Sequence, residues 1–187
     1  HSGWSLSVAL SPAGRLIVTG SGDRTAKIWD ATSGQELRTL DGHGGTIRAV
    51  AFSPDSQRIV TGSLDKTAKV WEAAGGKELF TLQGHGDGVL ALAFSLDGRR
   101  IATGCDDQTA KVWEAASGQE QLTLKGHRHE VGLSSFSAAF SPDGRQMVTG
   151  SWDQTAKVWD VTSDREQLTL QGHRHCVNSL VFSPDSR

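Results

Sequence analysis

The sequence has 187 residues, which is enough for one ordinary domain with a hydrophobic core. Its formal net charge is −2 and its acidic and basic residues are interspersed, so it lacks the clustered lysine and arginine of a nucleic-acid-binding surface. No apolar run approaches a membrane span, and no signal peptide is visible. Because the chain starts at His1 rather than methionine, we expect a processed product or an excised segment, in which missing targeting signals prove little.

The two cysteines, Cys105 and Cys176, lie in different sequence contexts. They do not have the pattern of a disulfide framework. We therefore expect reduced thiols and a cytoplasmic location.

One sequence pattern recurs along the whole chain. Residues 61–72 read TGSLDKTAKVWE, and nearly the same residues occur at 19–30, 103–114 and 149–160. The tryptophans of the four copies are 42, 42 and 46 residues apart; they are Trp29, Trp71, Trp113 and Trp159. A fixed period of this size indicates one supersecondary unit per repeat, which cannot bury its apolar face alone.

The repeat at residues 43–84 shows the elements that we expect in each unit. Short β-like runs at 47–52, 58–63, 67–71 and 78–82 are separated by turns, and Ser53-Pro54-Asp55-Ser56 has the composition of a tight reversal. No segment has the spacing of a long amphipathic helix. Consecutive strands joined by tight turns predict a four-stranded antiparallel meander. Apolar residues on both faces of the first three strands predict that neighbouring sheets cover each sheet on both sides.

Counted from each Gly-His pair, the chain forms a single repeat region, 1–187. It contains complete units at 1–42, 43–84, 85–126 and 127–172, and a partial fifth unit at 173–187. The fifth unit includes one expected strand, residues 177–182. The fourth unit is longer by four residues near Gly132, and that insertion is either a binding loop or a tolerated bulge.

The ordered motifs Gly-His, Ser-Pro-Asp-Gly, an Asp turn and Trp-Asp closely resemble the WD-repeat β-propeller family. The resemblance covers the whole chain. It implies an all-β fold of four four-stranded antiparallel blades plus a partial fifth, arranged as an open arc or as part of a larger or oligomeric ring. The high similarity between the copies also resembles the repeat arrays of large bacterial and fungal signalling ATPases.

The resemblance implies a structural hydrogen-bond network of His, Thr, Asp and Trp inside each blade. A buried indole N–H needs an acceptor, and a hydroxyl group can both accept and donate. Four copies of one constellation favour a structural role over a hydrolase triad, which needs one specialised site. The expected network residues are His1, Thr19, Asp23 and Trp29; His43, Thr61, Asp65 and Trp71; His85, Thr103, Asp107 and Trp113; and His127, Thr149, Asp153 and Trp159.

We expect no catalytic residue, no cofactor and no metal. The two His-Arg-His triplets, at 127–129 and 173–175, have a spacing that can hold a metal on an extended strand, but no cysteine or acid completes an evident ligand set. A recurring lysine at positions 27, 69, 111 and 157 is interpreted as an exposed ammonium on a blade surface near Asp30, Glu72, Glu114 and Asp160.

Partner-binding residues are expected where the copies differ, because shared positions are committed to the blade. In the family, partners bind at the rim that carries the Gly-His loops and the Asp turns. The residue before each turn Asp varies between Gly22, Leu64, Asp106 and Trp152, and an exposed tryptophan is a favoured interface anchor. The rim candidates are Trp4, Thr46, Arg48, Leu64, Asp87, Leu90, Asp106, Trp152, His175 and Asn178.

The predicted function is a non-enzymatic interaction scaffold or sensor that binds a protein or peptide on this rim, with no nucleic-acid or membrane partner. The alternative is a hydrolase or metal-dependent enzyme carried on the same scaffold. Four units and a partial fifth would not close well alone, so we expect a fragment of a larger propeller or a chain that self-associates to complete its ring.

Overall fold

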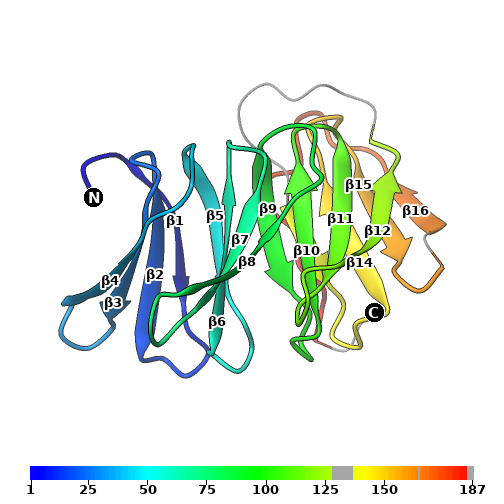
Figure 1. Ribbon diagram of the computed structural model, residues 1–187. Coiled ribbons are helices and arrows are strands. Elements are labelled where there is room, and N and C mark those ends of the chain that lie inside the picture. The colour runs from blue at the N-terminus through cyan, green and yellow to red at the C-terminus, as the bar shows by residue number, and fades with distance from the viewer. Residues whose placement is uncertain (128–136, 164, 185–187) are drawn as a thin grey trace. The chain divides into compact units, whose positions relative to one another are not determined.

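The computed structural model describes residues 1–127, 137–163 and 165–184. Two compact units, His1–Val89 and Leu90–Arg187, divide the chain. The described residues form four sheets of four antiparallel strands each, and their order follows the sequence (Figure 1). This confirms the predicted all-β fold. The described part of the chain contains no helix long and apolar enough to span a bilayer.

The first unit contains the first two sheets. The first sheet is formed by β1 (Ser5–Leu10), β2 (Leu16–Ser21), β3 (Ala26–Asp30) and β4 (Glu36–Leu40). The second is formed by β5 (Ile47–Phe52), β6 (Arg58–Ser63), β7 (Ala68–Glu72) and β8 (Glu78–Leu82). The expected strands of the 43–84 repeat are all present, and β7 is displaced by one residue from the prediction.

The second unit contains the other two sheets. The third sheet is formed by β9 (Val89–Phe94), β10 (Arg100–Cys105), β11 (Thr109–Glu114) and β12 (Glu120–Lys125). The fourth is formed by β13 (Ser137–Phe140), β14 (Gln146–Gly150), β15 (Ala156–Asp160) and β16 (Arg165–Leu170). The insertion predicted near Gly132 lies outside the described residues.

The strand predicted at residues 177–182 is wrong. This segment has no β structure, although Val177, Leu180 and Phe182 pack on the fourth sheet. A strand needs a hydrogen-bonded neighbour, and within the described residues the partial unit supplies no second strand for this segment to pair with.

The reversal between β5 and β6 shows why its residues suit it. The Ser53 hydroxyl donates to the Asp55 carboxylate at 2.5 Å and accepts from the Arg58 N–H at 2.9 Å. Ser56 then adopts φ = 61°, a left-handed conformation that the corresponding Gly14 reaches without steric cost at φ = 71°. The local hydrogen bonds therefore hold a conformation that most residues avoid.

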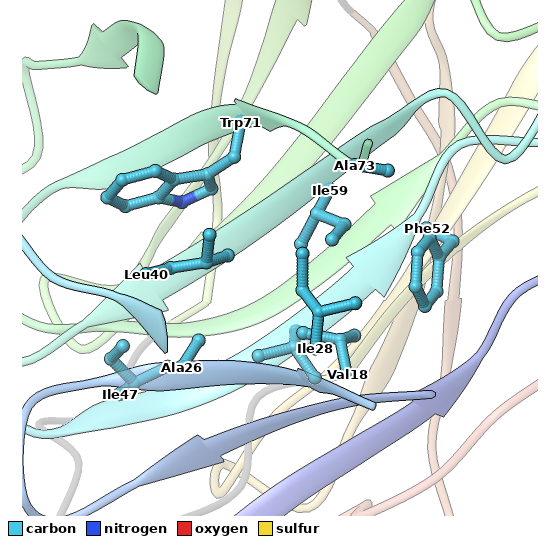
Figure 2. Close-up of a cluster of buried hydrophobic side chains, with 10 residues drawn as sticks. Val18, Ala26, Ile28, Leu40, Ile47, Phe52, Ile59, Trp71 and Ala73 are labelled. Carbon is cyan, nitrogen blue, oxygen red and sulfur yellow. The ribbon is translucent and has the colours of Figure 1, made fainter. Parts of the chain in front are cut away.

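In each unit the core lies between two sheets. In the first unit, Val18 and Ile28 of the first sheet meet Ile59 and Trp71 of the second (Figure 2). In the second unit, Val112 and Leu124 share a cluster with Met147 and Trp159. Within each unit, one sheet thus packs face to face on the next, as the apolar pattern predicts.

Candidate functional site: polar networks and the loop rim

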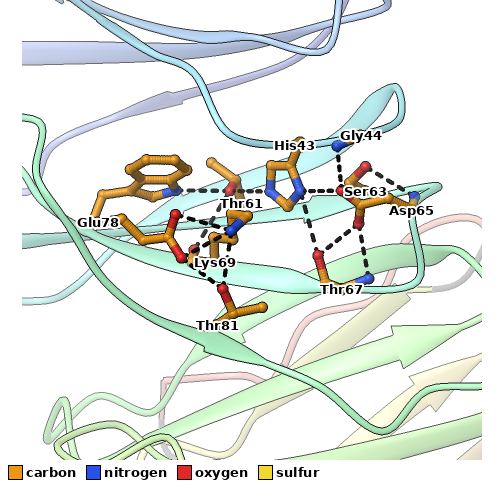
Figure 3. Close-up of polar contacts among 10 residues, drawn as sticks. His43, Gly44, Thr61, Ser63, Asp65, Thr67, Lys69, Glu78 and Thr81 are labelled. Carbon is orange, nitrogen blue, oxygen red and sulfur yellow. Dashed lines mark hydrogen bonds and ion pairs between the residues drawn. The ribbon is translucent and has the colours of Figure 1, made fainter.

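A continuous hydrogen-bond chain crosses the second sheet (Figure 3). Trp71 donates its indole N–H to the Thr61 hydroxyl over 2.9 Å. The Thr61 Oγ1 lies 2.8 Å from His43 Nε2, and His43 Nδ1 lies 2.7 Å from the Asp65 carboxylate. Asp65 also accepts from the Gly44 N–H and from the Thr67 hydroxyl. The chain therefore ties the entry loop, two strands and the Asp turn of one sheet together.

Burial and hydrogen bonding determine the protonation states of His43 and Asp65 in this network. Burial lowers the pKa of His43 from its usual value, although the hydrogen bond to Asp65 opposes the shift. Burial alone would raise the pKa of Asp65, but hydrogen bonds from Thr67 and His43 outweigh it and lower that pKa. A neutral His43 thus donates Nδ1–H to an ionised Asp65 and accepts the Thr61 O–H at Nε2, so every polar group is satisfied.

The same geometry recurs in the first and fourth sheets. His1 Nε2 lies 2.7 Å from Thr19 Oγ1 and Nδ1 lies 3.0 Å from Asp23, while Trp29 donates to Thr19 at 2.9 Å. In the fourth sheet, His127 lies 2.8 Å from both Thr149 and Asp153, and Trp159 donates to Thr149 at 2.8 Å.

In the third sheet, Trp113 donates to Thr103 at 2.8 Å, and Asp107 accepts from Thr109 at 2.6 Å. His85 is buried.

In the second, third and fourth sheets, the threonine hydroxyl of the network is not accessible to a substrate. The hydroxyls of Thr61, Thr103 and Thr149 belong to residues that are 0% exposed. Each also accepts an indole N–H, so attack by the hydroxyl would break a buried hydrogen bond. The arrangement can stabilise a sheet, and it lacks the access that a hydrolase triad requires.

The sequence-based interpretation of the recurring lysines is wrong on two points: which acids the lysines pair with, and how exposed the lysine side chains are. Lys69 lies 2.9 Å from Glu78 and donates to Thr81 at 3.0 Å. The corresponding Lys111 and Lys157 are each 8% exposed, and they pair with Glu120 and Glu166 rather than with the acids next to the tryptophans. The signal for this pairing is a Glu-x-x-Thr pattern nine residues after each lysine, at positions 36, 78, 120 and 166. These ion pairs fasten the fourth strand of each sheet to the third.

In the first unit, the Gly-His loops and the Asp turns lie side by side at one end of each sheet. The Gly22 N–H donates to the Trp4 carbonyl, and the Leu64 N–H donates to the Thr46 carbonyl, both at 2.9 Å. Trp4 is 84% exposed and Leu64 is 44% exposed. Arg48 and Thr46 are half-buried, and Asp87 is exposed. Sequence reasoning thus selected side chains at one end that solvent reaches.

Leu64 also has a structural contact. A Cβ atom placed on Gly88 would lie 2.7 Å from a Leu64 methyl group, so this leucine rests on the entry loop of the following repeat. Part of its surface is therefore committed to packing, and the rest remains open at the rim.

In the second unit, the rim candidates differ in the solvent exposure of their side chains. Trp152 is 42% exposed, and His175 and Asn178 are exposed. The Val177 N–H donates to the Ser151 carbonyl at 3.0 Å, which places the fifth entry loop beside the Trp152 turn. Asp106 is half-buried. Leu90 packs against the hydrophobic cluster of this unit, so its side chain serves the core.

The repeats identify the family of this chain. It matches the family described as WD domain, G-beta repeat, over residues 1–30, 34–72, 76–114, 118–160 and 164–187. The chain therefore belongs to the WD-repeat family, and the resemblance drawn from the Gly-His and Trp-Asp motifs is confirmed. Domains of this family generally mediate protein–protein interaction.

Curated relatives match single repeats. Dynein assembly factor with WD repeat domains 1 of Mus musculus is 61% identical over 36 residues, which are 19% of this chain and 9% of that protein. Nuclear distribution protein PAC1-2 of Postia placenta is 56% identical over 43 residues, 23% of this chain and 10% of that protein. The probable serine/threonine-protein kinase PkwA of Thermomonospora curvata is 48% identical over 44 residues, 24% of this chain and 6% of that protein. The matches thus span a tenth or less of each relative.

Proposed function

We propose that this chain is a non-enzymatic interaction module that binds a protein or peptide through its rim loops. The observation that carries this proposal is that shared and variable positions of the repeats have different surroundings. The residues shared by the repeats are used in buried networks and sheet packing, whereas Trp4, Leu64 and Trp152 differ between the repeats and are open to solvent at the loop ends.

The chemistry of these loops fits recognition of a partly apolar protein surface. Aromatic and aliphatic side chains that project from rigid scaffolds are common anchors of protein interfaces, because they bury area with little loss of conformational entropy. Membership of the WD-repeat family supports the same reading. A scaffold or sensor role in signalling, and a cytoplasmic location, are parts of this proposal.

The proposal is tested by affinity capture with matched variants. Four immobilised proteins are incubated with the same lysate: the wild type, Leu64→Ser, Trp152→Ala and Leu96→Ser. The proteins that each one retains are quantified by mass spectrometry. Leu96 is 67% exposed in the turn between β9 and β10, away from the Asp turns, so it controls for loss of an exposed leucine.

A rim partner should be retained by the wild type and by Leu96→Ser, and its affinity should fall about thirtyfold when an anchor that contributes about 2 kcal/mol is removed. Undiminished capture by both rim variants would refute the proposal. A partner whose capture falls as much with the control Leu96→Ser as with the rim variants would also count against the proposal.

A further inference from the structure

Arg48 is the extra residue of a β-bulge at the rim end of β5. The strand pairs Ile47 with Ser63 and then Ala49 with Gly62, so Arg48 has no residue opposite it on β6. Its neighbours Ile47 and Ala49 are 0% and 8% exposed, whereas Arg48 is half-buried. The bulge therefore releases one side chain from the packing of an otherwise buried stretch.

The repeat framework does not require a basic residue at this position. Counted from the histidine of each Gly-His pair, the equivalent residues of the first and third repeats are Leu6 and Leu90. Leu6 is the extra residue of the same bulge between β1 and β2, and it is 38% exposed. The repeat at 43–84 has a complete repeat on each side of it in the sequence, so the exposure of Arg48 does not come from an end of the chain.

The guanidinium group of Arg48 is available to a ligand. Such a group has a permanent charge and five N–H donors, so a half-buried arginine usually has an acceptor in the protein. The side chain of Arg38, for example, donates to the Leu37 carbonyl at 2.6 Å. Within the part of the chain that the structure describes, the Arg48 side chain makes no ion pair and no hydrogen bond. A ligand carboxylate can therefore bind it without breaking an existing contact.

Two acidic side chains at this end of the first unit are directed away from a ligand. The carboxylates of Asp23 and Asp65 are part of the hydrogen-bond networks of their sheets, and their side chains are only 12% and 18% exposed (Figure 3). Asp87 is exposed, and its carboxylate accepts the Gly88 N–H of its own loop at 2.8 Å. The internal bonds of these acids thus leave the basic side chains of the rim to interact with a partner.

The residue after each turn Asp is basic in the first unit and neutral in the second. Arg24 and Lys66 hold this position with φ of 72° and 75°, and Gln108 and Gln154 hold it with φ of 72° and 68°. Because glutamine adopts the same conformation, the turn does not need the positive charge. The Lys66 ammonium donates to the Gly86 carbonyl at 2.8 Å, which holds it at the rim without neutralising it.

We propose that the rim of the first unit binds an acidic peptide segment of a partner protein, with Arg48 pairing with a carboxylate and Leu64 contacting a neighbouring apolar side chain. Leu64 lies at the same end of the sheet, since its N–H donates to the Thr46 carbonyl, two residues before Arg48. A carboxylate accepts two N–H groups of a guanidinium side by side, and Arg24 and Lys66 add positive charge that attracts the segment. This inference rests on the proposed function, because it names the chemistry of the partner at the same rim.

Selection from a phage-displayed library of random linear peptides on the full chain tests the inference. Peptides selected by the wild type should be enriched in Asp and Glu beside an apolar residue. Changing the selected acid to its amide should weaken binding to the wild type about tenfold, measured by fluorescence anisotropy, and should not change binding to Arg48→Leu. The leucine is the residue that the neighbouring repeats carry, so this variant should fold, which circular dichroism checks.

Two further variants serve as controls. Arg48→Lys should keep part of the preference for the acid, because it retains the charge but loses the fork of the guanidinium. Arg15→Leu removes an exposed arginine in the turn between β1 and β2, at the opposite end of the sheet, and should bind the peptides as the wild type does.

The outcomes separate this inference from the rim proposal. Peptides that lose affinity with Leu64→Ser but show no preference for acids, or an amide change that costs as much with Arg48→Leu as with the wild type, would overturn the acidic partner alone. Selected peptides that bind Leu64→Ser and Trp152→Ala as tightly as the wild type would overturn the rim proposal together with this inference. A library from which the wild type selects no peptide would also overturn the inference.

Discussion

At the scale of single residues, the molecule depends on one hydroxyl per sheet. Thr61 accepts from Trp71 and donates to His43, so it satisfies two buried groups at once. The His43 ring is in turn fixed by Asp65. A residue that resembles a catalytic group by its neighbours is thus buried and hydrogen-bonded in a way that suits a structural role.

Removing that hydroxyl should be costly. Thr61→Val keeps the shape but leaves the Trp71 N–H and His43 Nε2 without a partner, so we expect a loss of about 3 kcal/mol in unfolding free energy, measured by urea denaturation. Thr61→Ser keeps the hydroxyl and should lose only about 1 kcal/mol. Thr19→Val is the matched control, because Thr19 is half-buried and water can replace its bonds. Equal losses for the Val and Ser variants at position 61 would contradict this account.

Acid should destabilise the protein in two stages. Because burial lowers the pKa of His43 and His127, the folded state keeps them neutral while the unfolded state binds protons near pH 6.5. Stability is therefore fully present above that pH and falls as pH drops below it. For Asp23, burial alone would raise the pKa, but hydrogen bonds from Thr25, Ser2 and Ser21 outweigh it and lower the pKa to about 2, so a second loss begins below about pH 4.

Thermal unfolding followed from pH 8 to pH 3 checks this profile. His175→Gln should leave it unchanged, since His175 is exposed. A melting temperature that rises between pH 7 and pH 5 would show that the buried histidines are charged in the folded state.

At the scale of elements, close approach of sheets depends on a glycine in the second strand of a repeat. Gly20 lies under Ile47 and Val50 of the following sheet, and its backbone is extended strand. Its requirement is therefore space rather than a special backbone conformation.

Gly20→Ala should lower the unfolding free energy of the first unit by about 2 kcal/mol, because the new methyl group would clash with the Ile47 and Val50 side chains and push the two sheets apart. Gly22→Ala is the control two residues away, where an added Cβ meets no atom closer than 3.8 Å. Urea denaturation of both variants measures the difference. Equal stability of the two would mean that the sheets adjust freely at this contact.

At the scale of the whole molecule, each sheet depends on its neighbours. Stability in such repeat arrays is approximately a sum of unit and interface terms. Within the first unit, β5 has the burial pattern of a covered strand and β1 that of an open one. Local stability should therefore differ between two strands that hold the same position in their repeats.

Hydrogen exchange at low protein concentration should show this difference. Backbone amides of β1 should exchange about tenfold faster or more than those of β5, because opening β1 exposes less buried surface. Mass spectrometry of peptides from the two strands makes the comparison within one sample. Equal protection of both strands would show that the first sheet is covered in solution.

Much of this protein follows from the sequence by itself. The 42-residue period, the turn residues and the alternation of apolar positions predicted the sheets, and the resemblance to the WD-repeat family implied the His43, Thr61 and Trp71 contacts. These features lie within one repeat, where strand geometry links spacing directly to contact.

Only the tertiary structure decided the rest. It paired Lys69 with Glu78, placed Leu90 against the core, and left residues 177–182 without a ladder. It also exposed Val8 while burying Val50, although both hold the same position in their repeats. The physical reason is that burial and pairing depend on which neighbouring sheet is present, and no repeat carries that information in its own residues.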